Sequence, residues 1–192
     1  MSGTEMPEFD RRKPAHETIW TVDEVFFEHE CAALIAEFER LGFEEALITT
    51  SRGMVMNKAV RNNDRLILDD PERAEALWLR VREHVPGKIG GWKAYGLNER
   101  FRIYRYKPGQ RFKLHFDGSF SRVEDRDESA ITFLVYLNDD FVGGETAFPD
   151  YGVTVKPRTG SGLFFFHPVL HEGREVHEGV KYVLRTDVMY RR

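Results

Sequence analysis

The sequence predicts a mostly β protein, a double-stranded β-helix or jelly roll, supported on one side by α-helices. From about residue 90 to the C-terminus, short apolar segments alternate with turn residues. This regular spacing is typical of a β-sandwich or barrel and argues against a βαβ fold. Two segments with helical periodicity, residues 23–40 and 71–85, precede these strands. The whole chain has 192 residues, which is enough for one domain with a proper core.

The chain divides into a lead-in and one domain. Residues 1–17 are charged, contain two prolines and show no periodicity, so we expect a flexible segment. Residues 18–192 form the predicted domain. Within it, residues 18–90 supply helices and strands for support, and residues 91–192 form the jelly-roll core.

Composition narrows the classes of function. The net charge of −4 and the absence of a long Lys/Arg run argue against a nucleic-acid partner. Cys31 is the only cysteine, so no disulfide pair or zinc ribbon is expected. The N-terminus has no apolar core of a signal peptide, and no apolar run is long enough to span a bilayer. We therefore predict a cytoplasmic protein without a membrane partner.

The first half of the chain contains two helices among short strands. Residues 18–22 are apolar enough for a first strand, and Gly42 occupies the position of a C-terminal cap for the helix at residues 23–40. Residues 44–67 alternate loosely, which predicts two or three strands around a mobile polar loop at residues 60–65. Asp70 is the expected N-cap of the second helix, which Pro86 ends.

The second half consists of strands. Residues 130–137 are apolar almost throughout, so both faces of this strand should be covered. The other expected strands are residues 101–106, 111–117, 145–148, 152–156, 162–167 and 182–190.

A candidate metal site lies at the end of the strand at residues 111–117. Alternate residues of a strand share a face, so His115 and Asp117 point the same way. With one more histidine they would form the facial triad that holds Fe(II) in non-haem oxygenases. His167, His171 and His177 are the candidates for the third ligand. A surface His and Asp on an edge strand is the alternative.

A buried cation is expected further along the chain. Lys181, Arg185 and Asp187 share one face of the last strand by period two. A cation on an inward face needs an anionic partner, and a bound dicarboxylic acid would provide one. The opposite orientation, with both cations in water, gives the same periodicity.

Four motifs in order resemble the prolyl-4-hydroxylase-like branch of the 2-oxoglutarate/Fe(II) oxygenases. They are Y-x-x-G-x-x-F-x-x-H-x-D at residues 106–117, T-F-L-V-Y-L-N at 132–138, G-G-E-T-A-F-P at 143–149, and G-x-G-L-F-F-F followed by H-E-G and E-G-x-K within 160–181. Each motif alone is weak, but four in this order are specific. The resemblance covers roughly residues 90–190.

The resemblance implies which residues form the site. His115, Asp117 and His171 would bind iron, with His171 placed in a loop ahead of the last strand. Lys181 would pair with the far carboxylate of 2-oxoglutarate. The residues that would contact this cosubstrate are Tyr106, Tyr136 and, more weakly, Thr146. Arg185 would be a second cosubstrate cation or an ion-pair partner of Asp187, and His167 and His177 would lie in the surroundings or at the surface.

The implied reaction is hydroxylation of a C–H bond, coupled to decarboxylation of 2-oxoglutarate to succinate, with Fe(II) and O2 as cofactors and ascorbate as an expected reductant. Arg61 and Asn63, in the polar loop at the site mouth, are candidate substrate contacts, although a solvated turn is an equal alternative. Phe112 and Asp187 stand where prolyl hydroxylases have Tyr and tend to have Trp, which argues against peptidyl proline. Asp187 would favour a positively charged substrate or amide donors. A protein side chain, prolyl included, or a small molecule is expected.

Two other functions compete with this enzyme. A non-catalytic, cupin-like module would bind metal or 2-oxoglutarate as a sensor, but it has no need of both an intact triad and Lys181. Nucleic-acid demethylation on the same scaffold is disfavoured because the chain is acidic and has no basic groove pattern.

Overall fold

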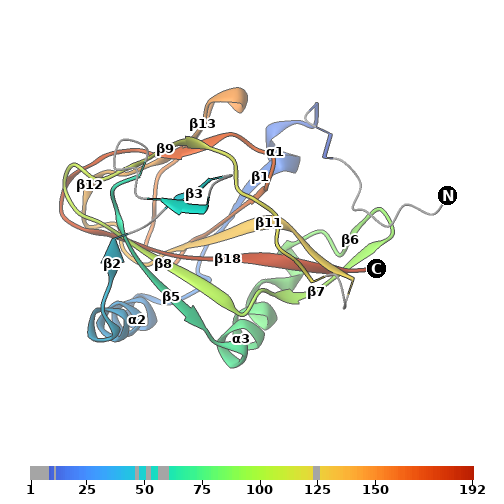
Figure 1. Cartoon of the computed structure of the whole chain (residues 1–192), viewed down its shortest axis with the longest axis horizontal. Helices are drawn as coiled ribbons and strands as arrows, with labels where there is room; N and C mark the ends of the chain where they lie inside the picture. The colour runs from blue at the N-terminus through green and yellow to red at the C-terminus, as the bar shows by residue number, and fades with distance from the viewer. Residues whose placement is uncertain (1–8, 11, 46–47, 51–52, 56–60, 123–125) are drawn as a thin grey trace.

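The computed structural model describes residues 9–10, 12–45, 48–50, 53–55, 61–122 and 126–192. Two sheets form its body, and in Figure 1 the smaller sheet lies above the main sheet while helices α2 and α3 lie below it. The described helices are α1 (Ala15–Thr18), α2 (Glu28–Leu41) and α3 (Pro71–Val81), with 3-10 turns η1 (Arg82–His84) and η2 (Pro149–Tyr151). None of these helices is long and apolar enough to cross a membrane. The predicted mostly β jelly roll with flanking helices is confirmed.

The main sheet follows one continuous path of strands. In order of pairing it contains β1 (Ile19–Val22), β15 (Gly162–Phe166), β11 (Asp127–Tyr136), β18 (Lys181–Arg191), β8 (Arg100–Tyr106), β5 (Asp64–Asp69) and β2 (Glu44–Glu45). Three more strands join it from the side: β10 (Ser121–Arg122) on β11, and β7 (Trp92–Leu97) with β6 (Lys88–Ile89) on β18. Strands from before residue 90 thus lie in the same sheet as those of the expected core.

The smaller sheet carries residues that become important below. Its order is β14 (Val153–Val155), β13 (Thr146–Phe148), β16 (His171–Gly173) and β9 (Phe112–His115). Two further strand pairs complete the described part of the chain: β12 (Val142–Gly143) with β17 (Val176–Glu178), and β3 (Ile48–Thr50) with β4 (Gly53–Val55).

The hydrophobic core packs on both faces of the main sheet. Phe133 and Phe164, on neighbouring strands of the main sheet, are stacked with ring centres 4.2 Å apart. Phe165 of the main sheet packs edge-on against Phe148 of the smaller sheet at 5.1 Å. All four are fully buried, and aromatic burial of this size is a major contribution to stability. The contact between Phe165 and Phe148 joins the two sheets that hold the site, while Phe133 and Phe164 pack on the opposite face of the main sheet.

Strand β18 is the central strand of the molecule. It pairs with β11 on one side and with β8 and β7 on the other, in antiparallel register. Lys181 lies opposite Tyr106, and Asp187 lies opposite Thr132. This register brings the inward side chains of β18 against residues from distant parts of the sequence.

The start of α2 differs from the prediction because the backbone turns at Glu24. This residue has a positive φ of 55°, which a helix excludes, so the helix begins at Glu28 and not at residue 23. The side chain of Glu30 accepts a hydrogen bond from the Phe27 amide and satisfies one free N–H of the first turn. The predicted caps are confirmed: Gly42 has a φ of 87°, and Asp70 accepts a hydrogen bond from the Arg73 amide at the start of α3.

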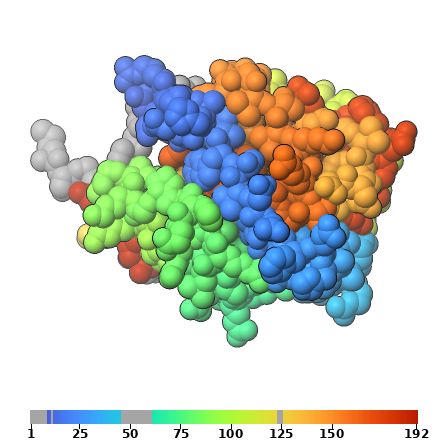
Figure 2. Space-filling view, turned by 180° about the vertical axis from the view of Figure 1, so that it is seen from behind, coloured from blue at the N-terminus to red at the C-terminus, as the bar shows by residue number. Residues whose placement is uncertain are grey.

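The N-terminal lead-in, predicted to be flexible over residues 1–17, includes a short helix and a ring contact with the main sheet. It contains α1, and Phe9 stacks on Phe166 with ring centres 4.8 Å apart. Seen from behind, the chain from α1 through β1 to α2 crosses the back of the molecule (Figure 2). Residues 1–8 and 11 lie outside the described residues.

Three boundaries near the site also differ from prediction. Strand β9 ends at His115, so Asp117 follows the strand and does not lie in it. His171 lies in strand β16 and not in a loop, because this segment pairs with β9 and β13. Strand β5 begins at Asp64, within the segment predicted as a mobile loop. Val60, together with Ala46 and Ala59 of the predicted strands, lies outside the described residues.

Candidate active site

Three potential metal ligands meet where β9 and β16 pair. His115 and His171 are opposite each other in register, and Asp117 follows two residues after His115. Ligand atoms of the three side chains all lie within 4.8 Å of one another. Nε2 of His115 is 3.8 Å from Oδ1 of Asp117, and Nε2 of His171 is 3.7 Å from Oδ2 of Asp117. Long-range strand pairing thus gathers the residues that the motif spacing had predicted.

Backbone carbonyls orient both imidazole rings. Nδ1 of His115 lies 2.7 Å from the carbonyl oxygen of Lys113, and Nδ1 of His171 lies 3.0 Å from that of Val169. A carbonyl oxygen only accepts, so we assign the proton of each ring to Nδ1. Each Nε2 then offers its lone pair to the space between the three residues.

The charge states also suit a divalent cation. Burial, with a smaller effect from His171, lowers the pKa of His115 to about 3, and burial also lowers the pKa of His171. Burial opposes ionisation of Asp117, but Arg185 and the two histidines hold its pKa well below its usual value. Two neutral imidazoles and one carboxylate on one side of a cavity are the donor set of a non-haem Fe(II) site. The residues therefore fit the metal.

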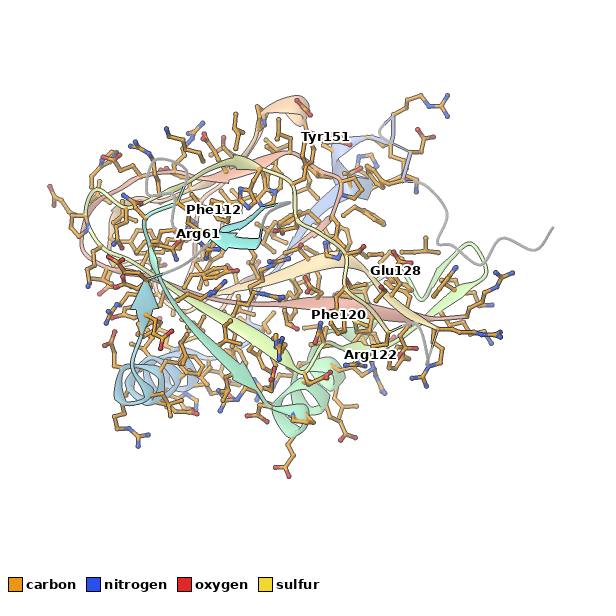
Figure 3. All side chains as sticks on the ribbon, viewed as in Figure 1. Arg61, Phe112, Phe120, Arg122, Glu128 and Tyr151 are labelled. Carbon is orange, nitrogen blue, oxygen red and sulfur yellow. The ribbon has the colours of Figure 1, made fainter. Side chains whose placement is uncertain are left out.

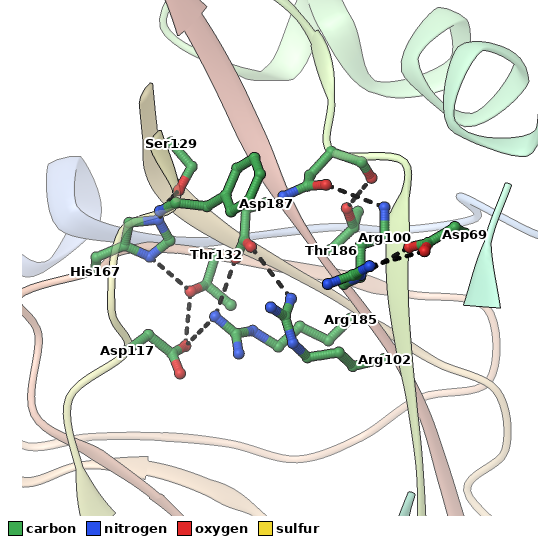
Figure 4. A network of polar contacts seen from close by, with 12 residues as sticks. Asp69, Arg100, Arg102, Asp117, Ser129, Thr132, His167, Arg185, Thr186 and Asp187 are labelled. Carbon is green, nitrogen blue, oxygen red and sulfur yellow. Dashed lines mark hydrogen bonds and ion pairs between the residues drawn. The ribbon is translucent and has the colours of Figure 1, made fainter. Parts of the chain in front are cut away.

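A chain of hydrogen bonds supports Asp117 from behind (Figure 4). The hydroxyl of Thr132 donates to Oδ2 of Asp117 at 2.7 Å and therefore accepts from Nδ1 of His167 at 3.0 Å. Nε2 of His167 lies 2.9 Å from the hydroxyl of Ser129. His167 is thus a buried member of this chain and not one of the three clustered ligands, while His177 is exposed.

Arg185 links Asp117 to Asp187. Its Nη2 lies 3.3 Å from Oδ2 of Asp117 and 3.0 Å from Oδ1 of Asp187. Asp187 is 1% exposed and is also contacted by Arg102 at 3.5 Å. Of the two roles predicted for Arg185, the geometry corresponds to the ion-pair partner. Asp187, engaged by two guanidinium groups, has little capacity left to attract a positively charged substrate.

A buried lysine lies at the other end of the same cavity. Lys181 is 3% exposed, and its Nζ donates a 2.6 Å hydrogen bond to the carbonyl oxygen of Gly144. The ammonium group lies 5.3 Å from the ring centre of Tyr106 and 5.4 Å from that of Tyr136. The hydroxyls of Tyr136 and Thr146 are 2.7 Å apart. Burial lowers the pKa of Lys181 to about 7, so this cation lacks a full counter-charge.

Gly144 permits the close approach of this lysine. A Cβ atom at Gly144 would lie 3.2 Å from Cδ of Lys181 and 3.0 Å from the ring of Phe141, and the residue has a positive φ of 70°. A larger residue would therefore push the lysine from its place.

One small cavity of about 40 Å³ contains Lys181 and the three potential metal ligands. The group of His115, Asp117 and His171 is called the metal cluster below. The lining of the cavity comprises Tyr104, Tyr106, Phe112, His115, Asp117, Leu134, Thr146, His171, Gly173, Lys181, Val183 and Arg185. Alternate residues of β18 line this cavity, as the period-two pattern predicted.

Phe112 connects His115 to Arg61, and Figure 3 shows Phe112 and Arg61 close together. Phe112 lies 3.5 Å from His115 between ring centres, and the guanidinium carbon of Arg61 lies 4.5 Å from the Phe112 ring. The same guanidinium carbon lies 4.4 Å from the centre of the Tyr104 ring. Asn63 accepts a 2.7 Å hydrogen bond from Nε of Arg61. The structure thus brings Arg61, Asn63 and Phe112 together beside the cluster.

A second, larger cavity of about 970 Å³ reaches the cluster from the N-terminal side. It is lined by α1, β1 and the chain after β9, with Trp20, Phe116 and Phe166 among its apolar residues. Asp117 lines both cavities. This gives a bulky molecule room next to the metal cluster.

Several residues of the site carry no signal in the sequence. Thr132 lies within an apolar strand, and its contact with Asp117 depends on how β11 pairs with β18. Tyr104 and Arg102 alternate with apolar residues in β8, a pattern equally suited to a solvent-facing side. The polar residues of this strand become buried only because β5 and β18 flank it.

Comparison with known proteins agrees with this geometry. The family model described as the 2OG-Fe(II) oxygenase superfamily matches residues 101–186, which include the three clustered ligands and Lys181. A putative prolyl 4-hydroxylase of Acanthamoeba polyphaga mimivirus is 31% identical over 102 residues, covering 44% of this chain and 42% of the relative. A probable prolyl 4-hydroxylase of Arabidopsis thaliana is 30% identical over 167 residues, covering 72% of this chain and 48% of the relative. The chain thus spans less than half the length of these curated relatives.

A solved structure shows the same fold. The viral collagen prolyl hydroxylase of Paramecium Bursaria Chlorella virus-1, in complex with 2OG, superimposes with a TM-score of 0.62 at 22% identity, covering 91% of this chain and 97% of that one. Family match, relatives and the His-Asp-His cluster agree with one another. Residues 101–186 thus match the 2OG-Fe(II) oxygenase superfamily, and the relatives similar to this chain, like the solved structure that shares its fold, are prolyl hydroxylases.

Proposed function

We propose that this protein is a 2-oxoglutarate- and O2-dependent Fe(II) dioxygenase that hydroxylates a C–H bond of its substrate. The observation that carries this proposal is the placement of His115, Asp117 and His171 in one cavity with the buried cation Lys181. When bound, Fe(II) with 2-oxoglutarate and O2 supplies the oxidising chemistry, which converts 2-oxoglutarate to succinate and CO2.

His115, Asp117 and His171 are proposed to hold the metal. The carbonyl oxygens behind the two imidazoles fix the direction of each Nε2, and the hydroxyl of Thr132 fixes the carboxylate of Asp117. Because the three ligands come from one side, the opposite side of the metal is left for cosubstrate and oxygen.

Lys181 is proposed to bind the far carboxylate of 2-oxoglutarate. A buried ammonium group with a depressed pKa gains its missing counter-charge when a carboxylate binds. Tyr106, Tyr136 and Thr146 surround Lys181 and provide hydroxyl groups for the same carboxylate. Arg185 is assigned to Asp117 and Asp187 in this proposal and not to the cosubstrate.

The substrate is proposed to be a side chain of a protein or a small molecule that enters beside Asp117. The cavity of about 970 Å³ next to this residue supports a substrate of either size. Arg61, Asn63 and Phe112 are the proposed contacts, and Phe112 lacks the hydroxyl expected in a prolyl hydroxylase. We also propose ascorbate as the reductant and the cytoplasm as the location.

An anaerobic titration with Fe(II) and 2-oxoglutarate tests the proposal. The wild-type protein should develop a visible metal-to-ligand charge-transfer band, and admission of oxygen should release succinate. The band should be absent in His171→Ala and weakened in Lys181→Ala. The matched control His177→Ala replaces an exposed histidine and should retain the band.

Two results would contradict the proposal. A folded wild-type protein without the band would show that the barrel does not carry this chemistry. A band without succinate formation would favour the non-catalytic sensor.

A further inference from the structure

Arg61 carries a buried positive charge that has no anionic partner among the described residues. The residue is 5% exposed, and its Nε donates to the neutral amide oxygen of Asn63. Its buried Nη2 atom has no hydrogen-bond partner in the part of the chain that the structure describes. No carboxylate in the described parts of the chain lies within ion-pair distance of its guanidinium group. A buried cation in this state is costly unless something else neutralises it.

The position of Arg61 directs this charge toward the proposed active site. Its guanidinium group contacts the rings of Phe112 and Tyr104, both of which line the cavity of the metal cluster. Phe112 in turn stacks on His115. The free donor is therefore separated from a proposed metal ligand by a single aromatic ring.

Neighbouring arginines increase the positive charge and do not cancel it. Arg102 and Arg185 already engage Asp187, and Arg185 also engages Asp117, so neither carboxylate is left for Arg61. Burial, and then the charge of Arg61, lowers the pKa of Arg65, which has no ion-pair partner among the described residues. Arg185 lines this end of the cavity, Arg61 and Arg102 lie near its lining residue Tyr104, and Arg65 lies near Arg61, so the positive charges here outnumber the carboxylates paired with them.

The cosubstrate does not account for this surplus. Lys181 and Arg185 project from β18 four residues apart, which separates them by about 13 Å along the strand. Arg61 belongs to the Arg185 end, because Tyr104 contacts both arginines. The far carboxylate of 2-oxoglutarate, if bound at Lys181 as proposed, lies at the opposite end.

We propose that the hydroxylation substrate carries an oxyanion, a carboxylate or a phosphate, that binds Arg61 next to the metal centre. The inference rests on the proposed function and specifies its substrate class. A guanidinium group has the fork of donors that matches both oxyanions. Asp187 alone predicted a positively charged substrate, whereas Arg61 predicts a negatively charged one. The difference arises because Arg102 and Arg185 already pair with the carboxylate of Asp187.

Small anions can test this site without knowledge of the full substrate. Mn(II) replaces Fe(II), 2-oxoglutarate is added to saturation so that Lys181 is occupied, and propionate, methylphosphonate or the neutral propionamide is titrated in. The paramagnetic relaxation of the probe protons reports binding close to the metal. We expect relaxation of one or both anions but not of propionamide, and the stronger anion identifies the carboxylate or phosphate source.

Variants assign the binding to Arg61. Arg61→Gln should weaken anion binding about 10-fold, as expected for the loss of a charge-assisted hydrogen bond, while the affinity for 2-oxoglutarate stays unchanged. Arg61→Lys should retain part of the anion affinity, because it keeps the positive charge. The control Arg158→Gln removes an exposed guanidinium group and should behave as the wild type. If Arg61→Gln fails to fold, the wild-type comparison of acid with amide and the Arg61→Lys variant decide the question.

Specific outcomes would overturn the inference. Equal relaxation of propionate and propionamide, or full anion binding in a folded Arg61→Gln protein, would leave Arg61 with a packing role only. If Mn(II) and 2-oxoglutarate fail to bind, the proposed function fails separately. Saturation-transfer NMR of the same anions on metal-free wild type and Arg61→Gln then still measures the anion site.

Discussion

His115 and His171 face each other across the antiparallel pair of β9 and β16, with ring centres 4.2 Å apart. A metal bound between them would connect two strands that no covalent link joins. We expect metal binding to stabilise the fold, by about 2.7 kcal/mol when the free metal is at 100 times its Kd.

Thermal unfolding with and without Mn(II) measures this stabilisation. His171→Ala should lose the increase in Tm, and His177→Ala should retain it because its side chain is exposed. An equal increase in the His171→Ala protein would place the metal elsewhere.

The low pKa of Lys181 predicts that 2-oxoglutarate binding consumes a proton. Burial lowers this pKa from 10.5 to about 7, so at pH 8 the lysine of the empty pocket is mostly neutral. A bound carboxylate favours the charged form and raises the pKa again. The affinity for 2-oxoglutarate should therefore fall as the pH rises above 7, by up to about tenfold per unit.

Calorimetry at pH 8 in two buffers of different ionisation enthalpy measures the proton uptake. Lys181→Met should abolish it and weaken 2-oxoglutarate binding, whereas the exposed Lys156→Met should change neither. The free energy of unfolding depends on pH in the opposite direction. Between pH 7 and 10.5 the lysine binds a proton in the unfolded protein but not in the empty folded one, so the folded protein becomes more stable as the pH rises through this range. Affinity independent of pH would contradict the assignment of Lys181.

The hydroxyl of Thr132 is expected to tune the metal site. Thr132→Val keeps the shape of the side chain but removes the hydrogen bond to Asp117 and leaves Nδ1 of His167 without its acceptor. We expect the metal Kd to increase by about 10-fold, within the range for loss of a group that orients a ligand. The control Thr154→Val changes an exposed strand residue and should have no effect on the Kd, as measured by metal titration.

Asp187 is expected to be a stabilising residue. Asp187→Asn removes the carboxylate that pairs with both Arg102 and the buried guanidinium group of Arg185. We expect the free energy of unfolding to fall by about 3–5 kcal/mol. Urea denaturation measures the free energy of unfolding. The control Asp69→Asn breaks a half-exposed pair with Arg100 and should have a much smaller effect. Similar values for both variants would show that the buried ion pairs are dispensable.

The parts of the site that depend on local pattern could be predicted from the sequence. His115 and Asp117 lie two residues apart, and the period of β18 placed Lys181 and Arg185 on one face. Residues whose environment depends on distant pairing could not be predicted. His171 was expected in a loop because the segment between β15 and β18 has no strand-like alternation, yet β9 and β13 flank it.

Arg61 shows the same limit for side chains. The residues that follow it, Asn62 to Asp64, are polar, which indicates a solvated loop, but the rings of Tyr104 and Phe112 from other segments pack against its guanidinium group. The helix at residues 23–40 was placed too early because composition does not reveal the positive φ of Glu24. In each case a contact or a backbone turn beyond the local pattern determined the outcome.

Strand β18 fixes distances within the site. Neighbouring strands hold it by hydrogen bonds on both sides, so it cannot slip by one residue without breaking both ladders and turning Lys181, Arg185 and Asp187 to the opposite face. The strand thus keeps the side chains of Lys181 and Asp187 at a fixed separation along its axis. The reach from Lys181 to Arg185 is therefore set by the backbone of the sheet and does not depend on which side chains the strand carries.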